Sequence, residues 1–135
     1  MSSARRHAQQ LVDLDLTHDA AAVRRAAFEA SAFVARRVVD AVPGDARRIV
    51  ATGGGTRVDA WVQALADCTR LPVHVADVPE GGALGAAFVA RCAAGLETSM
   101  TDASRWARTA RIVEPDAAWA DAAAERYERF VEVAG

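Results

Sequence analysis

The stretch VATGGGTRVDAW, Val50 to Trp61, places three consecutive glycines between an apolar run and an amphipathic segment. Glycine tolerates positive φ and allows another chain or a ligand to approach the backbone closely. The run RRIVAT before the glycines, Arg47 to Thr52, is β-branched and apolar and predicts a short buried strand. The residues after the glycines predict a helix from about Arg57. The expected inward face of this helix is formed by Val58, Trp61, Val62 and Leu65, and its outward face by Asp59, Gln63 and Asp67.

A strand, a glycine turn and a helix form the first half of a βαβ unit, and LPVHVADVPEGG (71–82) supplies the second strand, expected at Val73 to Ala76. Two strands joined through a helix should be parallel, with a right-handed crossover. Further helices are expected over 19–42, 81–96, 101–107 and 116–133. The chain is therefore predicted to be an α/β protein, mostly helical with a short parallel βαβ unit. A two-stranded ribbon with unpaired edges is not a complete domain. We therefore expect that elements which would cover these sheet edges are missing from the chain.

Three of these helices carry an apolar face that predicts how they pack. In 19–42 the expected inward residues are Val23, Ala27, Ala30, Val34, Val38 and Ala41, and the outward stripe is Arg25, Glu29, Arg36 and Asp40. In 81–96 the small face for close packing is Gly82, Gly85, Ala86, Val89 and Ala93, followed by Gly95 as a C-terminal cap. In 116–133 the expected inward residues are Trp119, Ala123, Tyr127 and Phe130, and the outward ones Asp121, Glu125, Glu128 and Glu132.

The charged residues exclude several classes of function. The chain of 135 residues has a net charge of −2, and its 16 cationic residues are all arginine. Without lysine it contains neither a Walker A motif nor a Schiff-base nucleophile. The nearly balanced net charge also argues against the basic patch that is typical of nucleic-acid-binding proteins. Because the sequence shows no secretory signal and no run of 18 uncharged apolar residues, we expect a cytoplasmic protein with no nucleic-acid or membrane partner.

No catalytic centre stands out in the sequence, so we assign neither catalytic residues nor metal ligands. His7, His18 and His74 lie far apart without the spacing of a metal site. Cys68 and Cys92 form no CxxC pair and are expected to be reduced core residues. No carboxylate pair and no Ser/His/Asp set is evident.

The glycine turn is the candidate binding site. Between a strand and a helix, free backbone N–H groups and the positive end of the helix attract phosphate. Gly53, Gly54 and Gly55 do not form the G-x-G-x-x-G pattern, which argues against a Rossmann dinucleotide site. Asp59 lies in the first turn of the expected helix, where its carboxylate suits the helix dipole and could hydrogen-bond ribose hydroxyls. A turn of this composition is also common as a tight connection without a ligand.

Three stretches of the chain carry a distinctive set of motifs. In 52–96 the residues are Gly53, Gly54, Gly55, Trp61, Gln63, Ala66, Asp67, Pro72, Val73, Val75, Glu80, Ala83, Leu84, Gly85, Ala86 and Ala87. In LTHDAAAVRRAAFEASAF (16–33) they are Leu16, His18, Arg25, Ala26, Glu29, Ala32 and Phe33, and the third stretch is the tail EPDAAWADAAAERYERF (114–130). Together they resemble the FGGY family of carbohydrate kinases, most of all its xylulose-kinase-like members. The family patterns are GGGA-x-S-x-x-W-x-Q-x-x-A-D, R-P-V-x-V, E-x-x-A-L-G-A-A and, upstream, L-x-H-T-R-A-D-L-x-R-A-x-x-E-G-x-A-F.

The resemblance implies an actin/hexokinase-type (ribonuclease H-like) domain whose glycine-rich loop holds ATP with Mg²⁺. Carried over residue by residue, Gly53, Gly54 and Gly55 would form the nucleotide contacts and Asp59 the contact to the ribose or the adenine edge. Glu80 and the helix after it would support the site. Three positions depart from the family pattern: Thr56 stands for alanine, Val58 for serine and Ala30 for glycine.

The likeness covers 14–135, which is expected to be the C-terminal portion of the ATP-binding domain, with a flexible segment over 1–13. The family's catalytic aspartate and sugar pocket lie in an N-terminal domain without counterpart here. The chain alone is therefore expected to be inactive, although it resembles kinases of xylulose or a related sugar or polyol. Its expected partners are ATP and the missing N-terminal kinase domain, or further copies of itself through an uncovered sheet edge. A non-catalytic interaction module that retains a remnant of the kinase fold, and a small stand-alone nucleotide-binding protein, remain as alternatives.

Overall fold

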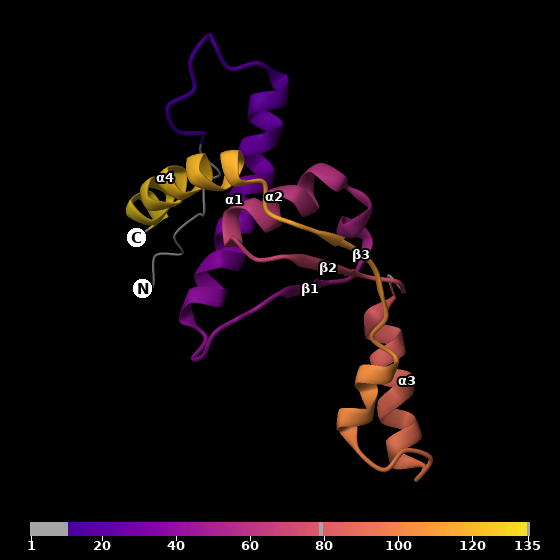
Figure 1. Cartoon of the computed structure of the whole chain (residues 1–135). Coiled ribbons are helices and arrows are strands. Elements are labelled where there is room, and N and C mark those ends of the chain that lie inside the picture. The colour runs from indigo at the N-terminus through magenta and orange to yellow at the C-terminus, as the bar shows by residue number, and fades with distance from the viewer. Residues whose placement is uncertain (1–10, 79, 135) are drawn as a thin grey trace, which may run out of the picture.

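The computed structural model describes residues 11–78 and 80–134, and shows helices gathered around a small mixed sheet (Figure 1). The elements in chain order are α1 (Ala20–Ala41), β1 (Ile49–Ala51), the 3-10 turn η1 (Gly54–Arg57), α2 (Asp59–Thr69), β2 (Val73–Ala76), α3 (Gly81–Ala93), the 3-10 turn η2 (Met100–Arg105), β3 (Thr109–Val113) and α4 (Ala117–Ala134). The predicted α/β character and the βαβ unit formed by β1, α2 and β2 are confirmed. His7 and most of the segment 1–13 lie outside the described residues.

The sheet has the order β1-β2-β3 and mixes two kinds of pairing. As predicted, β1 runs parallel to β2, with Ile49 opposite Val73. The third strand, β3, pairs antiparallel with β2 and places Val113 opposite Val73. The prediction of only two strands was therefore wrong. The sequence TARIV of β3 carries few large apolar residues, and the strand is half-exposed, so it lacks the apolar alternation that marks a buried strand.

The core lies on one face of the sheet, between the strands and the helices α1, α2 and α4. Its buried residues are Ala32, Phe33, Ala51, Val62, Leu65, Ala66, Cys68, Val73, Val75 and Ala123. Phe33 of α1 packs between two rings of α4, with centroid distances of 5.5 Å to Tyr127 and 5.4 Å to Phe130. Helix α2 contacts α1, α4 and the sheet, and its predicted inward residues Val62 and Leu65 are buried. This central helix therefore connects the glycine turn to the rest of the protein.

The predicted inward face of α1 is wrong, because the helix presents its charged stripe to the core. Val34 and Val38 are 55% and 60% exposed, whereas Glu29 on the opposite stripe is 2% exposed. Arg25 on that stripe is half-buried. Asp67 of α2, expected on the outside, is also fully buried. Both carboxylates have arginine partners, which offset the cost of removing a charge from water.

Helix α3 does not pack on the core but forms, with η2, an arm that extends away from the sheet (Figure 1). Phe88 is the buried residue of α3, and its ring meets Trp106 edge-on at 5.3 Å. At the far end of the arm, Glu97 forms ion pairs with Nε of Arg91 at 2.8 Å and with Nη2 of Arg105 at 2.6 Å. The small-residue face predicted for close packing is exposed throughout: Gly82, Gly85, Ala86, Val89 and Ala93. Small residues bury little area, and the one aromatic side chain of the helix, Phe88, packs against Trp106 just after η2.

The expected cap of α3 at Gly95 is confirmed by its geometry. Gly95 has φ +70°, and its N–H donates to the carbonyl of Cys92 at 3.0 Å. The N–H of Leu96 donates to the carbonyl of Arg91 at 2.9 Å, which completes a Schellman motif.

Candidate functional site

The glycine loop, defined here as Gly53–Arg57, connects the end of β1 to the start of α2. Gly53 has φ +96°, a conformation that other residues rarely adopt, and it reverses the chain after the strand. Thr56 is buried, and its Oγ1 donates to the carbonyl of Gly53 at 2.7 Å. The N–H of Val58 donates to the carbonyl of Gly55 at 3.0 Å. The turn therefore holds its shape through its own hydrogen bonds, and the helix begins at Asp59, two residues later than predicted.

The two glycines at the centre of the loop differ in their surroundings. A Cβ on Gly54 would meet no atom within 4 Å, so this side of the loop is open. A Cβ on Gly55 would lie 3.4 Å from the ring of Trp61, which supports the loop from the other side. The ring is held in turn by its Nε1, which donates to Oγ of Ser31 on α1 at 2.8 Å. The loop is thus backed by a fixed aromatic ring and exposes the backbone of Gly54.

Asp59, the predicted ribose contact, lies at the first residue of α2 with its side chain 88% exposed. Its Oδ1 forms an ion pair with Nη2 of Arg111 at 2.9 Å. The same Nη2 donates to the carbonyl of Thr56 at 2.9 Å. Arg111 comes from β3, and sequence analysis did not single it out, because it is one of 16 arginines without a local motif.

The start of α3 lies against the end of β1, next to the glycine loop. A Cβ on Gly81 would come within 2.6 Å of Oγ1 of Thr52, so only glycine allows this approach. Glu80, expected to support the site, is exposed at the N-terminus of α3 and makes no side-chain capping bond. Beside this contact lies an open apolar hollow of about 210 Å³, lined among others by Val50, Leu84, Phe88 and Trp106.

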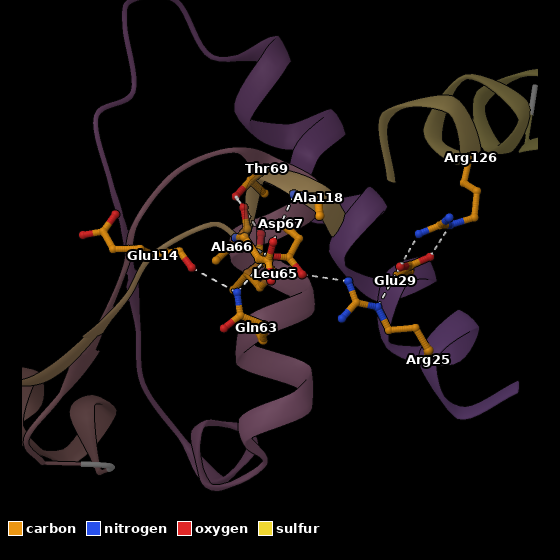
Figure 2. A network of polar contacts seen from close by, with 11 residues as sticks. Arg25, Glu29, Gln63, Leu65, Ala66, Asp67, Thr69, Glu114, Ala118 and Arg126 are labelled. Carbon is orange, nitrogen blue, oxygen red and sulfur yellow. Dashed lines mark hydrogen bonds and ion pairs between the residues drawn. The ribbon is translucent and has the colours of Figure 1, made fainter. Parts of the chain in front are cut away.

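Four other motif residues come together away from the loop, in a polar network between α1, α2 and α4: Arg25, Glu29, Gln63 and Asp67 (Figure 2). Arg25 donates to Glu29 at 2.7 Å and to Asp67 at 2.8 Å. Arg126 of α4 donates two hydrogen bonds of 2.7 Å to Glu29. Asp67 also accepts from Gln63 Nε2 at 2.8 Å and from the backbone N–H of Asp116 at 2.9 Å, where α4 is about to begin.

The electrostatics of this network favour a fixed set of charges. Burial alone would raise the pKa of Glu29, but the hydrogen bonds and charges of Arg126 and Arg25 outweigh it and hold this pKa below its ordinary value. Burial lowers the pKa of Arg25, yet its bonds to Asp67 and Glu29 leave that pKa raised overall. Burial also raises the pKa of Cys68 to about 12, so this thiol stays protonated at neutral pH. The network therefore holds the three helices α1, α2 and α4 together.

The described residues contain neither a cluster of metal-ligand side chains nor a helix that could span a membrane. Over 11–78 and 80–134, no three side chains of the His, Cys, Asp and Glu types gather as metal ligands would. In the same ranges, no helix is both long and apolar enough to span a bilayer.

Comparison with known proteins identifies the family. The sequence profile of the C-terminal domain of the FGGY family of carbohydrate kinases matches residues 2–94. The chain belongs to this family. The predicted membership is therefore confirmed, and the matched region includes the glycine loop and the network residues Arg25, Glu29, Gln63 and Asp67.

Individual FGGY proteins show how much of the family this chain represents. Autoinducer-2 kinase of Escherichia coli (strain K12) is 42% identical over 65 residues, which are 45% of this chain and 12% of that protein. Glycerol kinase of Renibacterium salmoninarum is 38% identical over 94 residues, which are 66% of this chain and 19% of that protein. The crystal structure of xylulose kinase from Rhodospirillum rubrum matches with a TM-score of 0.73 and 32% identity, over 90% of this chain and 25% of that one. The chain thus spans less than a fifth of the length of these curated relatives, and it has part of the actin/hexokinase-type fold of FGGY kinases, as predicted.

Proposed function

We propose that residues 14–135 are the C-terminal portion of the ATP-binding domain of a carbohydrate kinase, and that the glycine loop forms one side of its nucleotide site. Membership in the FGGY family supports the activity class, and two of the relatives named above are kinases of glycerol and of xylulose. The observation that carries the assignment of the site is the open backbone at Gly54. It is flanked by Gly53, which has a positive φ, and by Gly55, which packs against the ring of Trp61. Such a loop lets a phosphate or ribose approach the backbone without meeting a side chain.

The residues present fit one wall of a nucleotide site. Gly54 and Gly55 lie at the start of a helical turn, where backbone N–H groups have no intrahelical partner and can donate to an anion. Asp59 is exposed and adjacent, and its carboxylate can accept from ribose hydroxyls. ATP would supply the γ-phosphoryl group for transfer to a sugar hydroxyl. We expect the nucleotide to bind with Mg²⁺ and assign no metal ligand to the described residues, which gather no set of suitable side chains.

The free edge of the sheet and an exposed helix face are candidate contact surfaces for the remainder of the ATP-binding domain. In the described part of the chain, β1 is a terminal strand of the sheet and pairs only with β2. Helix α1 also exposes an apolar face, which includes Val34 and Val38. We propose that the preceding part of a kinase chain adds strands to the free edge of β1 and covers this face. The alternative role, an interaction module that binds a different partner, would use the same edge and the same face.

Two measurements test the proposal. Equilibrium binding of MgATP and MgADP to the chain tests the nucleotide site, and binding that is lost in Gly54→Val supports it. A coupled assay of ADP release with a panel of pentoses, hexoses and glycerol tests whether this chain can catalyse phosphoryl transfer without the N-terminal kinase domain. We expect no turnover by the chain alone, because phosphoryl transfer needs the clamps, the metal and the hydroxyl's base together. Sugar-dependent turnover that co-purifies strictly with this chain would contradict the proposal that the chain alone is inactive.

A further inference from the structure

Arg111 lies on the side of β3 that faces the glycine loop. Its position opposite Val75 on β2 places both side chains on the same face of the sheet. Val75 is buried, on the face that α2 covers, so Arg111 points toward the start of α2. Because β1 and β2 are parallel, the glycine loop leaves β1 at the same edge of the sheet at which β3 begins.

An irregularity in the pairing of β2 and β3 adjoins Arg111. The consecutive residues Val75 and Ala76 pair with Arg111 and Thr109, so β3 carries one extra residue, Ala110, at this point. A bulge of this kind bends the strand and redirects the neighbouring side chain. The bulge therefore bends β3 next to Arg111, the residue whose side chain reaches the loop.

The guanidinium of Arg111 joins the glycine loop at Thr56 to the first residue of α2, Asp59. Its Nη2 lies 2.9 Å from the carbonyl oxygen of Thr56 and 2.9 Å from Oδ1 of Asp59. Among the described residues, further supports of the loop come from within the loop itself and from Trp61. Arg111 thus supplies the hydrogen bond from the sheet to the loop, together with the positive charge beside Asp59.

We propose that Arg111 is a positioning residue of the nucleotide site, an inference that rests on the proposed function. Through Thr56 it fixes the loop whose Gly54 and Gly55 would meet the phosphates. Through Asp59 it offsets a negative charge that would otherwise repel an anionic ligand at short range. The planar fork of an arginine fixes the directions of the two N–H donors on Nη2, whereas the ammonium of a lysine rotates on a flexible stem.

The test compares four variants by two readouts, amide hydrogen exchange of residues 54–58 without nucleotide and the affinity for MgADP. Arg111→Met removes the charge and the donors, and Arg111→Lys keeps the charge without the fork. Arg111→Met/Asp59→Asn removes both charges. Arg70→Met is the matched control, because Arg70 pairs with Asp121 at 2.7 Å and lies at the far end of α2, about 16 Å along the helix.

In Arg111→Met we expect faster exchange in the loop and an affinity for MgADP about fivefold weaker, the scale of one partly exposed charge contact. Asp59→Asn added to Arg111→Met should restore the part of the affinity that depends on charge but not the loop protection, and Arg111→Lys should behave similarly. Arg70→Met should change neither readout. If wild type binds MgADP and Arg111→Met binds it equally well, this inference is overturned and the proposed function stands. If wild type binds no MgADP, the proposed function and this inference are both overturned.

Discussion

Nη2 of Arg25 on α1 donates a 2.8 Å hydrogen bond to Oδ2 of Asp67 on α2, a carboxylate with no solvent exposure. Asp67 lies at the opposite end of α2 from the glycine loop, and three donors converge on it from α1, α2 and the start of α4. The contact therefore fixes the helix that carries the loop relative to two other helices. A buried carboxylate with three donors is stable only while every donor is present.

Asp67→Asn should destabilise the protein strongly, because an amide group presents its own donor to a site filled with donors. Removing one partner of a buried ion pair typically costs about 3–5 kcal/mol. The control is Asp121→Asn, whose exposed pair with Arg70 should contribute about 0–1 kcal/mol. Urea unfolding followed by circular dichroism compares the two, and equal losses would show that the Asp67 network contributes no more than a surface pair.

The buried pairing of Glu29 predicts a specific dependence of stability on pH. Its pKa is lowered by folding, so its contribution is complete above the ordinary value of 4.5 and is lost as the pH falls through the lowered value. The stability difference between wild type and Glu29→Gln should therefore be large near neutral pH and shrink as the solution is acidified below about pH 4. Glu125→Gln, an exposed change on α4, should show a difference that stays near zero. A wild-type advantage over Glu29→Gln that does not depend on pH would refute the assignment.

Neighbouring glycines of the loop should respond differently to alanine. Gly53 has φ +96°, so Gly53→Ala should cost about 1–3 kcal/mol of backbone strain. Gly54 has no positive φ and no neighbour within 4 Å of a Cβ, so Gly54→Ala should leave the free energy of unfolding nearly unchanged. Thermal unfolding of both variants without ligand measures this contrast. A large loss in Gly54→Ala would mean that the side chain of residue 54 is already confined in the unliganded protein.

The exposed face of α1 and the free edge of β1 predict self-association of the isolated chain. Val34 and Val38 lie one turn apart on that face, and unpaired strand edges readily take up another strand. Light scattering after size exclusion should show oligomers, reduced in Val34→Glu/Val38→Glu. Met100→Glu on the arm, a residue 58% exposed, is the control and should change nothing. A compact wild-type monomer that unfolds cooperatively would contradict this prediction.

The parts of the fold set by local periodicity could be predicted from the sequence. The strand at Val73–Ala76 has the predicted bounds, and the glycine turn between β1 and α2 follows from the three glycines. The orientation of α1 could not be predicted from its own pattern, because Glu29 is buried by an arginine 97 residues further along the chain. A hydrophobic pattern places such a carboxylate outside, whereas the tertiary ion pair places it inside.

The candidate site was predictable only in part, for a similar reason. Gly53, Gly54, Gly55 and Asp59 do lie together, but Asp59 is engaged by Arg111 from a short strand that periodicity did not reveal. The resemblance already marked Arg25, Glu29, Gln63 and Asp67 as motif positions. The structure shows that these four form the support between helices and do not line the loop.

The central claim, that the glycine loop binds nucleotide, is tested most directly by thermal unfolding with and without millimolar MgATP or MgADP. Wild type, Gly54→Val and Asp59→Ala are compared, since a ligand bound only to the native state at 100 times its dissociation constant adds about 2.7 kcal/mol. We predict a modest rise in the melting temperature of wild type, a smaller rise in Asp59→Ala and none in Gly54→Val, because the Cβ of valine would occupy the open side of the loop. A folded wild type without any shift, or a full shift in Gly54→Val, would show that the loop is only a connection between β1 and α2.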